Sequence, residues 1–217
     1  MTKDWNFDEV IDRSGTASMK WEAQVLTRVF GKGRENLLPL WVADMDFNCP
    51  SVIRQAMEKR LEHQIYGYSL IDPDYFEALI SWYDRRHQWM IEKEWILTTP
   101  GVVPAINYMI QRFTQAGDKV LIQPPVYYPF AKAIRNNGRQ IAENPLQIVD
   151  GQYRMDFEDL EEKAKDPRVN LAILCSPHNP VGRVWNKEEL EAFGRICIDP
   201  DVLIISDEIH CDLIMPG

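Results

Sequence analysis

Apolar residues come in short runs from about residue 95 onward, and segments with helical spacing separate these runs. The runs predict β-strands at 95–99, 119–123, 139–143, 171–175 and 201–206. Apolar positions three and four residues apart predict helices near 105–113, 130–134, 156–160 and 187–196. This alternation is typical of βαβ units. We therefore expect an α/β fold with a mostly parallel sheet between two helical layers.

The first part of the chain has a weaker pattern. Residues 1–35 carry aromatic side chains among charged ones without firm periodicity, which suggests an arm that packs on something else. Residues 37–42 are a candidate strand. Helices are predicted to begin near Ser51, as an N-cap, and at Pro73, in a first helical turn.

Polar loops follow two of the predicted strands at their carboxyl ends. The run 171–175 stops at Ser176-Pro-His-Asn-Pro-Val-Gly182, whose prolines and glycine exclude both helix and ladder. The run 201–206 leads into Asp207-Glu-Ile-His210. Open α/β sheets bind ligands at the carboxyl ends of their strands. Two loops of this kind predict a binding site at that edge.

Two further loops add chemistry to the same edge. Thr99-Pro-Gly-Val-Val103 precedes a predicted helix, where free backbone N–H groups and the helix dipole bind anions; a plain tight turn is the alternative. The strand 119–123 ends at Pro124-Pro-Val-Tyr-Tyr128, which offers an aromatic face. An anion site, an aromatic face, the amide of Asn179 and the carboxylate of Asp207 suit a phosphorylated aromatic heterocycle. Pyridoxal 5′-phosphate (PLP), with its basic nitrogen and phenolic oxygen, has that shape.

Composition narrows the class of protein. The chain has 217 residues, 45% hydrophobic and 26% charged, as in ordinary globular proteins. A net charge of -9 argues against nucleic-acid and anionic-membrane partners. The four cysteines form no CxxC pair, His178 and His210 lack clustered metal-ligand partners, and no Ser-His-Asp signature occurs. No signal-peptide core or membrane-length apolar run is present, so we expect a cytoplasmic protein and no metal site.

Three motifs resemble those of the fold-type I PLP enzymes: Ser176-Pro-His-Asn-Pro-Val-Gly182, Ser206-Asp-Glu-Ile-His-Cys-Asp212 and Trp41-Val-Ala-Asp-Met-Asp-Phe47. With Tyr66-Gly-Tyr-Ser69, they resemble more narrowly the aminotransferase-like cystathionine β-lyases of the MalY and PatB type. The resemblance spans essentially the whole chain, in the same order.

The resemblance implies a role for each residue around the cofactor. Asp207 would pair with the protonated pyridine nitrogen, rather than only cap a strand end. Asn179 would bind the phenolic oxygen, rather than serve only as a turn residue. Tyr127 would stack on the ring, with Tyr128 as the alternative. The turn at Gly101, with the backbone N–H groups of Val102 and Val103, would bind the phosphate.

Other implied roles concern the substrate and the neighbouring subunit. Tyr68 would reach the phosphate bound by the other subunit of a homodimer, and Ala43 would meet the substrate carboxylate through its backbone. His210 stands where many aminotransferases have a tyrosine, so its role near the phenolic oxygen stays open.

The family's Schiff-base lysine has no counterpart here. It lies in a Ser-x-Ser-Lys-like segment beyond the Asp-Glu motif, whereas no lysine follows Lys187 before the chain stops at Gly217. The family's arginine for the substrate carboxylate would lie in the same missing part. We therefore expect an N-terminal portion of a longer enzyme. Residues 1–48 would form an arm and part of a small domain, and 49–217 an incomplete large cofactor-binding domain.

The implied activity is a PLP-dependent carbon–sulfur β-lyase acting on cystathionine or related sulfur amino acids, which gives pyruvate, ammonia and a thiol. A class I/II aminotransferase is the nearest alternative, because the cofactor cradle is shared. A non-catalytic cofactor-binding or regulatory protein is an alternative of another class. The 217 residues alone are expected to be inactive.

Overall fold

The computed structural model describes residues 6–33 and 37–215. The contacts within the chain divide it into two units, residues 1–77 and 78–217. Each unit is described by itself below. The predicted domain limits, 1–48 and 49–217, stay a prediction.

A parallel sheet forms the centre of the second unit. Its strands are β1 (Lys119–Ile122), β2 (Gln140–Glu143), β5 (Val169–Cys175) and β6 (Leu203–Asp207). Their order is β2-β1-β5-β6, and each neighbouring pair is parallel. All four carboxyl ends therefore lie at one edge of the sheet, where the predicted site residues follow.

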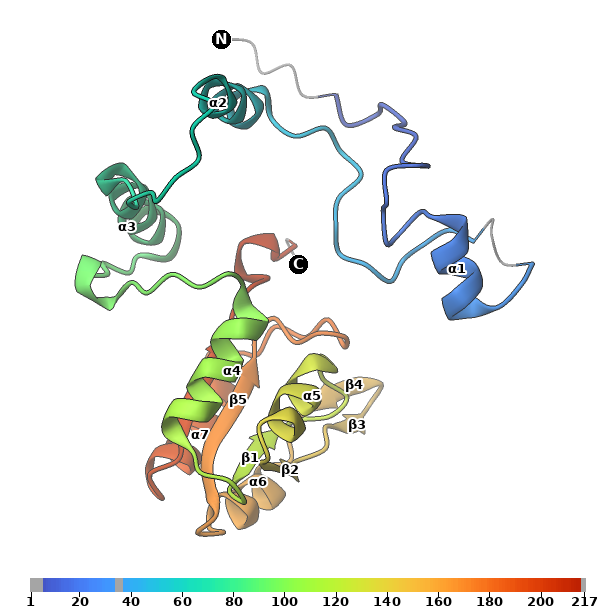
Figure 1. Ribbon diagram of the computed structural model, residues 1–217. Coiled ribbons are helices and arrows are strands. Elements are labelled where there is room, and N and C mark those ends of the chain that lie inside the picture. Colours follow the sequence, from blue (N-terminus) through green and yellow to red (C-terminus); the bar gives the residue numbers. More distant parts are fainter. Residues whose placement is uncertain (1–5, 34–36, 216–217) are drawn as a thin grey trace. The chain divides into compact units, whose positions relative to one another are not determined.

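Helices cover both faces of this sheet (Figure 1). Alternate strand residues such as Val120 and Ile173 pack with helices α4 (Val102–Phe113) and α5 (Pro129–Asn136). The residues between them, such as Leu121 and Ala172, pack with α6 (Phe157–Ala164) and α7 (Lys187–Ile198). Strand side chains alternate between faces, so a strand that is apolar throughout must be covered on both sides. The predicted three-layer α/β/α fold is confirmed.

Local capping residues start two of these helices. The Asp156 side chain accepts a hydrogen bond from the Asp159 N–H at the start of α6. Asn186 and Glu189 form a reciprocal capping box at the start of α7. Such bonds satisfy backbone N–H groups that have no partner within the helix. Both helices begin within one residue of the positions predicted from the sequence, near 156 and 187.

Two predicted strands are wrong. In the run 95–99, Trp95 ends a 3₁₀ turn, η1 (Lys93–Trp95), and residues 96–99 continue without a ladder. Residues 37–42 are also irregular. A short apolar run indicates burial but cannot supply the neighbouring strand that a ladder needs.

One hairpin was not predicted. Strands β3 (Gln147–Val149) and β4 (Gln152–Arg154) pair antiparallel. Asp150 and Gly151 join them, and both have positive φ, as a type I′ turn requires. The Asp150-Gly151 dipeptide is the sequence feature from which this hairpin could have been predicted.

The first unit contains α1 (Ala23–Phe30) and α2 (Ser51–Glu62), and α3 (Pro73–His87) crosses the boundary between the units. Pro50, rather than Ser51, holds the N-cap position of α2. The last turn described is η2 (Cys211–Leu213). Among the described residues, no helix has both the length and the apolar character needed to cross a bilayer.

Candidate cofactor site

The loops after β5 and β6 begin side by side at the carboxyl edge of the sheet. Cys175 pairs with Asp207 at the end of the ladder. The backbone N–H of Ser176 then donates to the carbonyl of Asp207 at 3.0 Å. The structure thus brings the Asn179 loop next to the Asp207 loop, as the sequence predicted for adjacent parallel strands.

Asp207 is a buried carboxylate with few hydrogen-bond donors around it. Its side chain accepts one hydrogen bond among the described residues, from the backbone N–H of Ile209 at 3.2 Å. Burial raises the pKa of this carboxyl, and the negative charge of Glu208 adds to the shift, while the Ile209 N–H and His210 oppose it. A buried carboxylate normally has several partners. The spare acceptor capacity of Asp207 fits a protonated ring nitrogen as an additional partner.

The turn before α4 presents two backbone donors. Gly101 has φ of +131°, a conformation that side chains with a Cβ rarely adopt. The N–H groups of Val102 and Val103 find no acceptor among the described residues, because they belong to the first turn of α4. Thr99 Oγ1 donates to the Gly101 carbonyl at 3.0 Å and braces the turn. These two N–H groups at a helix N-terminus fit a phosphate.

The loop after β1 carries two tyrosines with different surroundings. Tyr127 is half-buried and packs edge-on against the Phe130 ring, with centroids 5.7 Å apart. Tyr128 is 77% exposed. A ring held by core packing offers a more fixed face than an exposed one, which favours Tyr127 as the stacking residue.

Asn179 lies half-buried in a loop that closes on itself. The backbone N–H of His178 donates to the carbonyl of Arg183 at 2.7 Å, and the N–H of Gly182 donates to the carbonyl of His178 at 2.8 Å. Gly182 has φ of +73°, the left-handed conformation that such a turn favours. Sequence analysis missed His178, although it lies within the motif and is one of the most buried polar residues.

His210 is half-buried in the turn that follows Asp207 and precedes η2. It contributes electrostatically to Asp207, where its charge favours the ionised carboxylate. No hydrogen bond of its side chain is found among the described residues. Its role near the phenolic oxygen stays a prediction.

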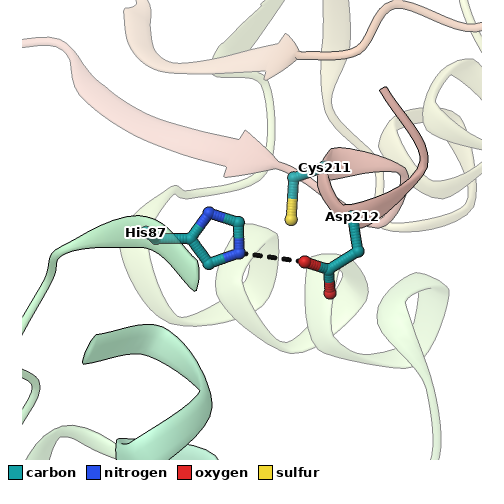
Figure 2. Close-up of side chains that lie close together, drawn as sticks. All are labelled: His87, Cys211 and Asp212. Carbon is teal, nitrogen blue, oxygen red and sulfur yellow. Dashed lines mark hydrogen bonds and ion pairs between the residues drawn. The ribbon is translucent and has the colours of Figure 1, made fainter. Parts of the chain in front are cut away.

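A second group of polar side chains lies where η2 meets the end of α3 in the same unit. The side chains of His87, Cys211 and Asp212 point toward one another (Figure 2). Their potential ligand atoms all lie within 4.8 Å of one another. His87 Nε2 lies 3.0 Å from Asp212 Oδ1, and Trp82 Nε1 donates to both Asp212 oxygens. Burial, with the carboxylates of Asp212 and then Glu208, raises the pKa of the Cys211 thiol. These donor types can bind a transition metal, but the ion pair and the indole already use the Asp212 carboxylate.

The first unit holds the other two predicted residues. Tyr68 is fully exposed, and Ala43 precedes a network of ion pairs. Asp46 accepts from Lys20 at 2.6 Å, Arg13 at 2.6 Å and the Trp21 indole at 2.7 Å.

These three donors, in that order, hold the pKa of the Asp46 carboxyl well below its usual range. Lys20 also donates to the carbonyl of Asp44 at 3.0 Å, and Arg13 pairs with the Asp44 side chain at 2.5 Å. The network therefore anchors the segment that carries Ala43. Sequence analysis missed it, because its partners are distant in sequence and only the Ala-Asp-Met-Asp-Phe motif marked it.

Residues 35–216 match the model of the aminotransferase class I and II family. The chain belongs to this family. This is consistent with the three-layer fold and with polar residues at the carboxyl edge of the sheet.

Individual proteins similar to this chain include several lyases. Cystathionine beta-lyase PatB of Bacillus subtilis is 47% identical, across 98% of this chain and 54% of that protein. Cystalysin from Treponema denticola, solved with a pyridoxal 5′-phosphate cofactor, is 41% identical with a TM-score of 0.91, across 98% of this chain and 54% of that one. The PLP-bound C-S lyase from Staphylococcus hominis is 37% identical with a TM-score of 0.85, across 96% and 52%. The chain spans about half the length of the relatives it matches.

Proposed function

We propose that this chain forms most of the cofactor cradle of a PLP-dependent carbon–sulfur β-lyase. The observation that carries the proposal is Asp207, a buried carboxylate whose pKa is raised and whose side chain has a single hydrogen bond within the part of the chain that the structure describes. The similarity to PatB and to the PLP-bound C-S lyase supports the reaction class.

The residues of the chain have distinct tasks in this proposal. The N–H groups of Val102 and Val103 bind the phosphate, and Tyr127 covers one face of the ring. Asn179 donates to the phenolic oxygen, which carries negative charge. Asp207 keeps the ring nitrogen protonated, and PLP when bound provides an electron sink for the substrate Cα. Ala43 offers its backbone to the substrate carboxylate.

The proposed assembly is a homodimer with two equivalent sites. Tyr68 projects fully into solvent from the first unit, which leaves its hydroxyl available to a neighbouring subunit. In the proposal it reaches the phosphate in the partner's site. The substrates are sulfur amino acids such as cystathionine.

An activity assay on the protein encoded by the complete gene tests this function. Incubation with cystathionine should release pyruvate without an added keto acid. Amino transfer that requires a keto acid, without pyruvate, would instead identify an aminotransferase. Cofactor binding with neither product would favour the regulatory alternative.

The Asp207→Ala variant tests the residue that carries the proposal. The change should leave the fold intact and remove most of the activity, because the ring nitrogen loses its anionic partner. Circular dichroism checks the fold, and pyruvate release checks the turnover. Near-normal turnover by this variant would contradict the assignment.

A further inference from the structure

Two loops that carry proposed cofactor contacts come from neighbouring strands, and one buried side chain joins them. The loop after β1 carries Tyr127, and the loop after β5 carries Asn179. His178 belongs to the second loop and is 1% exposed. Its Nε2 lies 3.0 Å from the backbone carbonyl of Pro125, which belongs to the first loop and is 53 positions away in sequence.

The geometry places a hydrogen on Nε2 of His178. A carbonyl oxygen only accepts, so Nε2 must carry the hydrogen and donate it to Pro125. Burial lowers the pKa of His178, although the surrounding backbone carbonyls oppose the shift, and the ring is therefore neutral near pH 7. Its Nδ1 is buried without a hydrogen-bond partner among the described residues.

Packing leaves this ring little freedom. The His178 ring meets the Trp185 ring edge-on, with centroids 5.4 Å apart. The Trp185 indole donates to the carbonyl of Cys175 at 2.9 Å, at the last position of β5. The guanidinium of Arg183 covers the outer face of the same indole, 4.8 Å from its centroid. His178 is thus held on one side by the end of β5 and donates on the other side to the β1 loop.

We propose that His178 is a positioning residue, which fixes the Tyr127 loop against the Asn179 loop and so sets the distance between the ring-stacking face and the donor to the phenolic oxygen. This inference rests on the proposed function. His178 touches neither group directly; it acts through the carbonyl of Pro125, two residues before Tyr127, and through its own neighbour Asn179. Its ring provides one directed hydrogen bond, from Nε2 to the carbonyl of Pro125.

Two substitutions distinguish the effect of the His178 hydrogen bond from the effect of its aromatic ring. His178→Phe keeps an aromatic ring against Trp185 but removes the donor to Pro125. His178→Gln carries an amide N–H at the same number of bonds from Cα as Nε2. The protein encoded by the complete gene is titrated with PLP, and the dissociation constant and the absorption spectrum of the bound cofactor are recorded. We expect His178→Phe to weaken PLP binding about tenfold and to shift the spectrum, and His178→Gln to restore both in large part.

Phe193→Leu is the matched control for general destabilisation. Phe193 is buried on α7, outside the two loops, so its change loosens the core without altering a residue of either loop. If Phe193→Leu weakens PLP binding as much as His178→Phe at equal loss of stability, then His178 is merely structural and the inference is overturned. Equal binding by His178→Phe and the unchanged protein would also overturn it.

Asp207→Asn and Asn179→Ala distinguish this inference from the proposed function. If neither weakens PLP binding, the cradle itself is wrongly placed and the proposed function fails. If both weaken it and His178→Phe does not, only the positioning role fails.

Discussion

At the scale of single residues, Asp207 shows how a binding group costs stability. The carboxylate is buried with one N–H partner, and burial raises its pKa. For an acid with a raised folded pKa, the protonated form is favoured in the folded state. The protonated Asp207 carboxyl therefore contributes to the stability of the fold below the ordinary pKa of 3.8. That contribution is lost as the pH rises through the folded pKa.

The first prediction follows from the loss of stability that ionisation of Asp207 causes. Asp207→Asn replaces the ionised carboxylate with a neutral amide, so the cofactor-free chain should gain thermal stability at about pH 7. The gain should shrink as the pH falls through the raised pKa of the folded carboxyl, because the native side chain then takes up its proton. Thermal unfolding at several pH values measures this. Asp201→Asn is the control, because Asp201 is exposed in the turn before β6, where Asn tolerates the positive φ of 66°. A variant that is less stable at about pH 7 would contradict the interpretation.

The residues of the site differ in how far the sequence reveals them. Asp207 and Asn179 follow apolar strands, so their place at the sheet edge could be predicted from pattern alone. His178 and Asp46 could not be assigned, because their partners, Pro125 and Lys20, are distant in sequence and only folding brings them together. Local pattern predicts which edge a residue occupies, whereas contacts between loops depend on packing.

At the scale of elements, the strongest local signals also proved the most reliable. The capping box at Asn186 and Glu189 starts α7 where the sequence predicted. The strand at 171–175 pairs on both sides, with β1 and β6. The run 95–99 has a similar composition but no partner strand, and it stays irregular. Helix starts depend on neighbouring residues, whereas strands depend on distant ones, which explains the difference.

The second prediction concerns the start of α7. Asn186→Ala removes the side chain that accepts from the Glu189 N–H at 2.8 Å, and the reciprocal bond then loses its geometry. The chain should lose about 1 kcal/mol of unfolding free energy. Urea denaturation measures the loss. Lys187→Ala, at the next position and 82% exposed, should change little. Equal effects of the two changes would show that the cap contributes nothing.

At the scale of the whole molecule, the residues with proposed roles are distributed over both units. Asp207, Asn179, Tyr127 and the turn at Gly101 belong to the second unit, whereas Ala43 and Tyr68 belong to the first. The second unit has a three-layer core of its own around the parallel sheet. Most of the proposed cofactor contacts belong to this unit, whereas the first unit carries the proposed substrate contact, Ala43, and the proposed contact to the neighbouring subunit, Tyr68.

The third prediction concerns assembly. We expect the protein encoded by the complete gene to be a homodimer, because Tyr68 is exposed and is proposed to serve the neighbouring subunit. Light scattering at micromolar concentration with PLP present measures the mass. A monomer alone would contradict the proposed shared site. Tyr68→Phe should then weaken PLP binding without changing the mass, because it removes only the hydroxyl.

The last prediction concerns the amine that must join PLP covalently in a β-lyase. Lys119 lies at the amino end of β1, opposite the site edge, and its ammonium pairs with Asp166 at 2.6 Å. Lys187 is 82% exposed in the first turn of α7, and Lys132 is exposed on α5. Lys163 pairs with Asp159 on α6. None of these four amines belongs to a loop at the carboxyl edge of the sheet.

The 217 residues by themselves should therefore make no pyruvate from cystathionine. Borohydride reduction with added PLP should label several lysines partially, because exposed amines react with the aldehyde without a defined site. Peptide mapping by mass spectrometry measures the labelling, and the protein encoded by the complete gene serves as the comparison, with one lysine labelled stoichiometrically. A single stoichiometrically labelled lysine in the 217-residue chain, together with pyruvate formation, would show that the nucleophile lies within it. Lys119, Lys132 and Lys187 would then be substituted one at a time to find it.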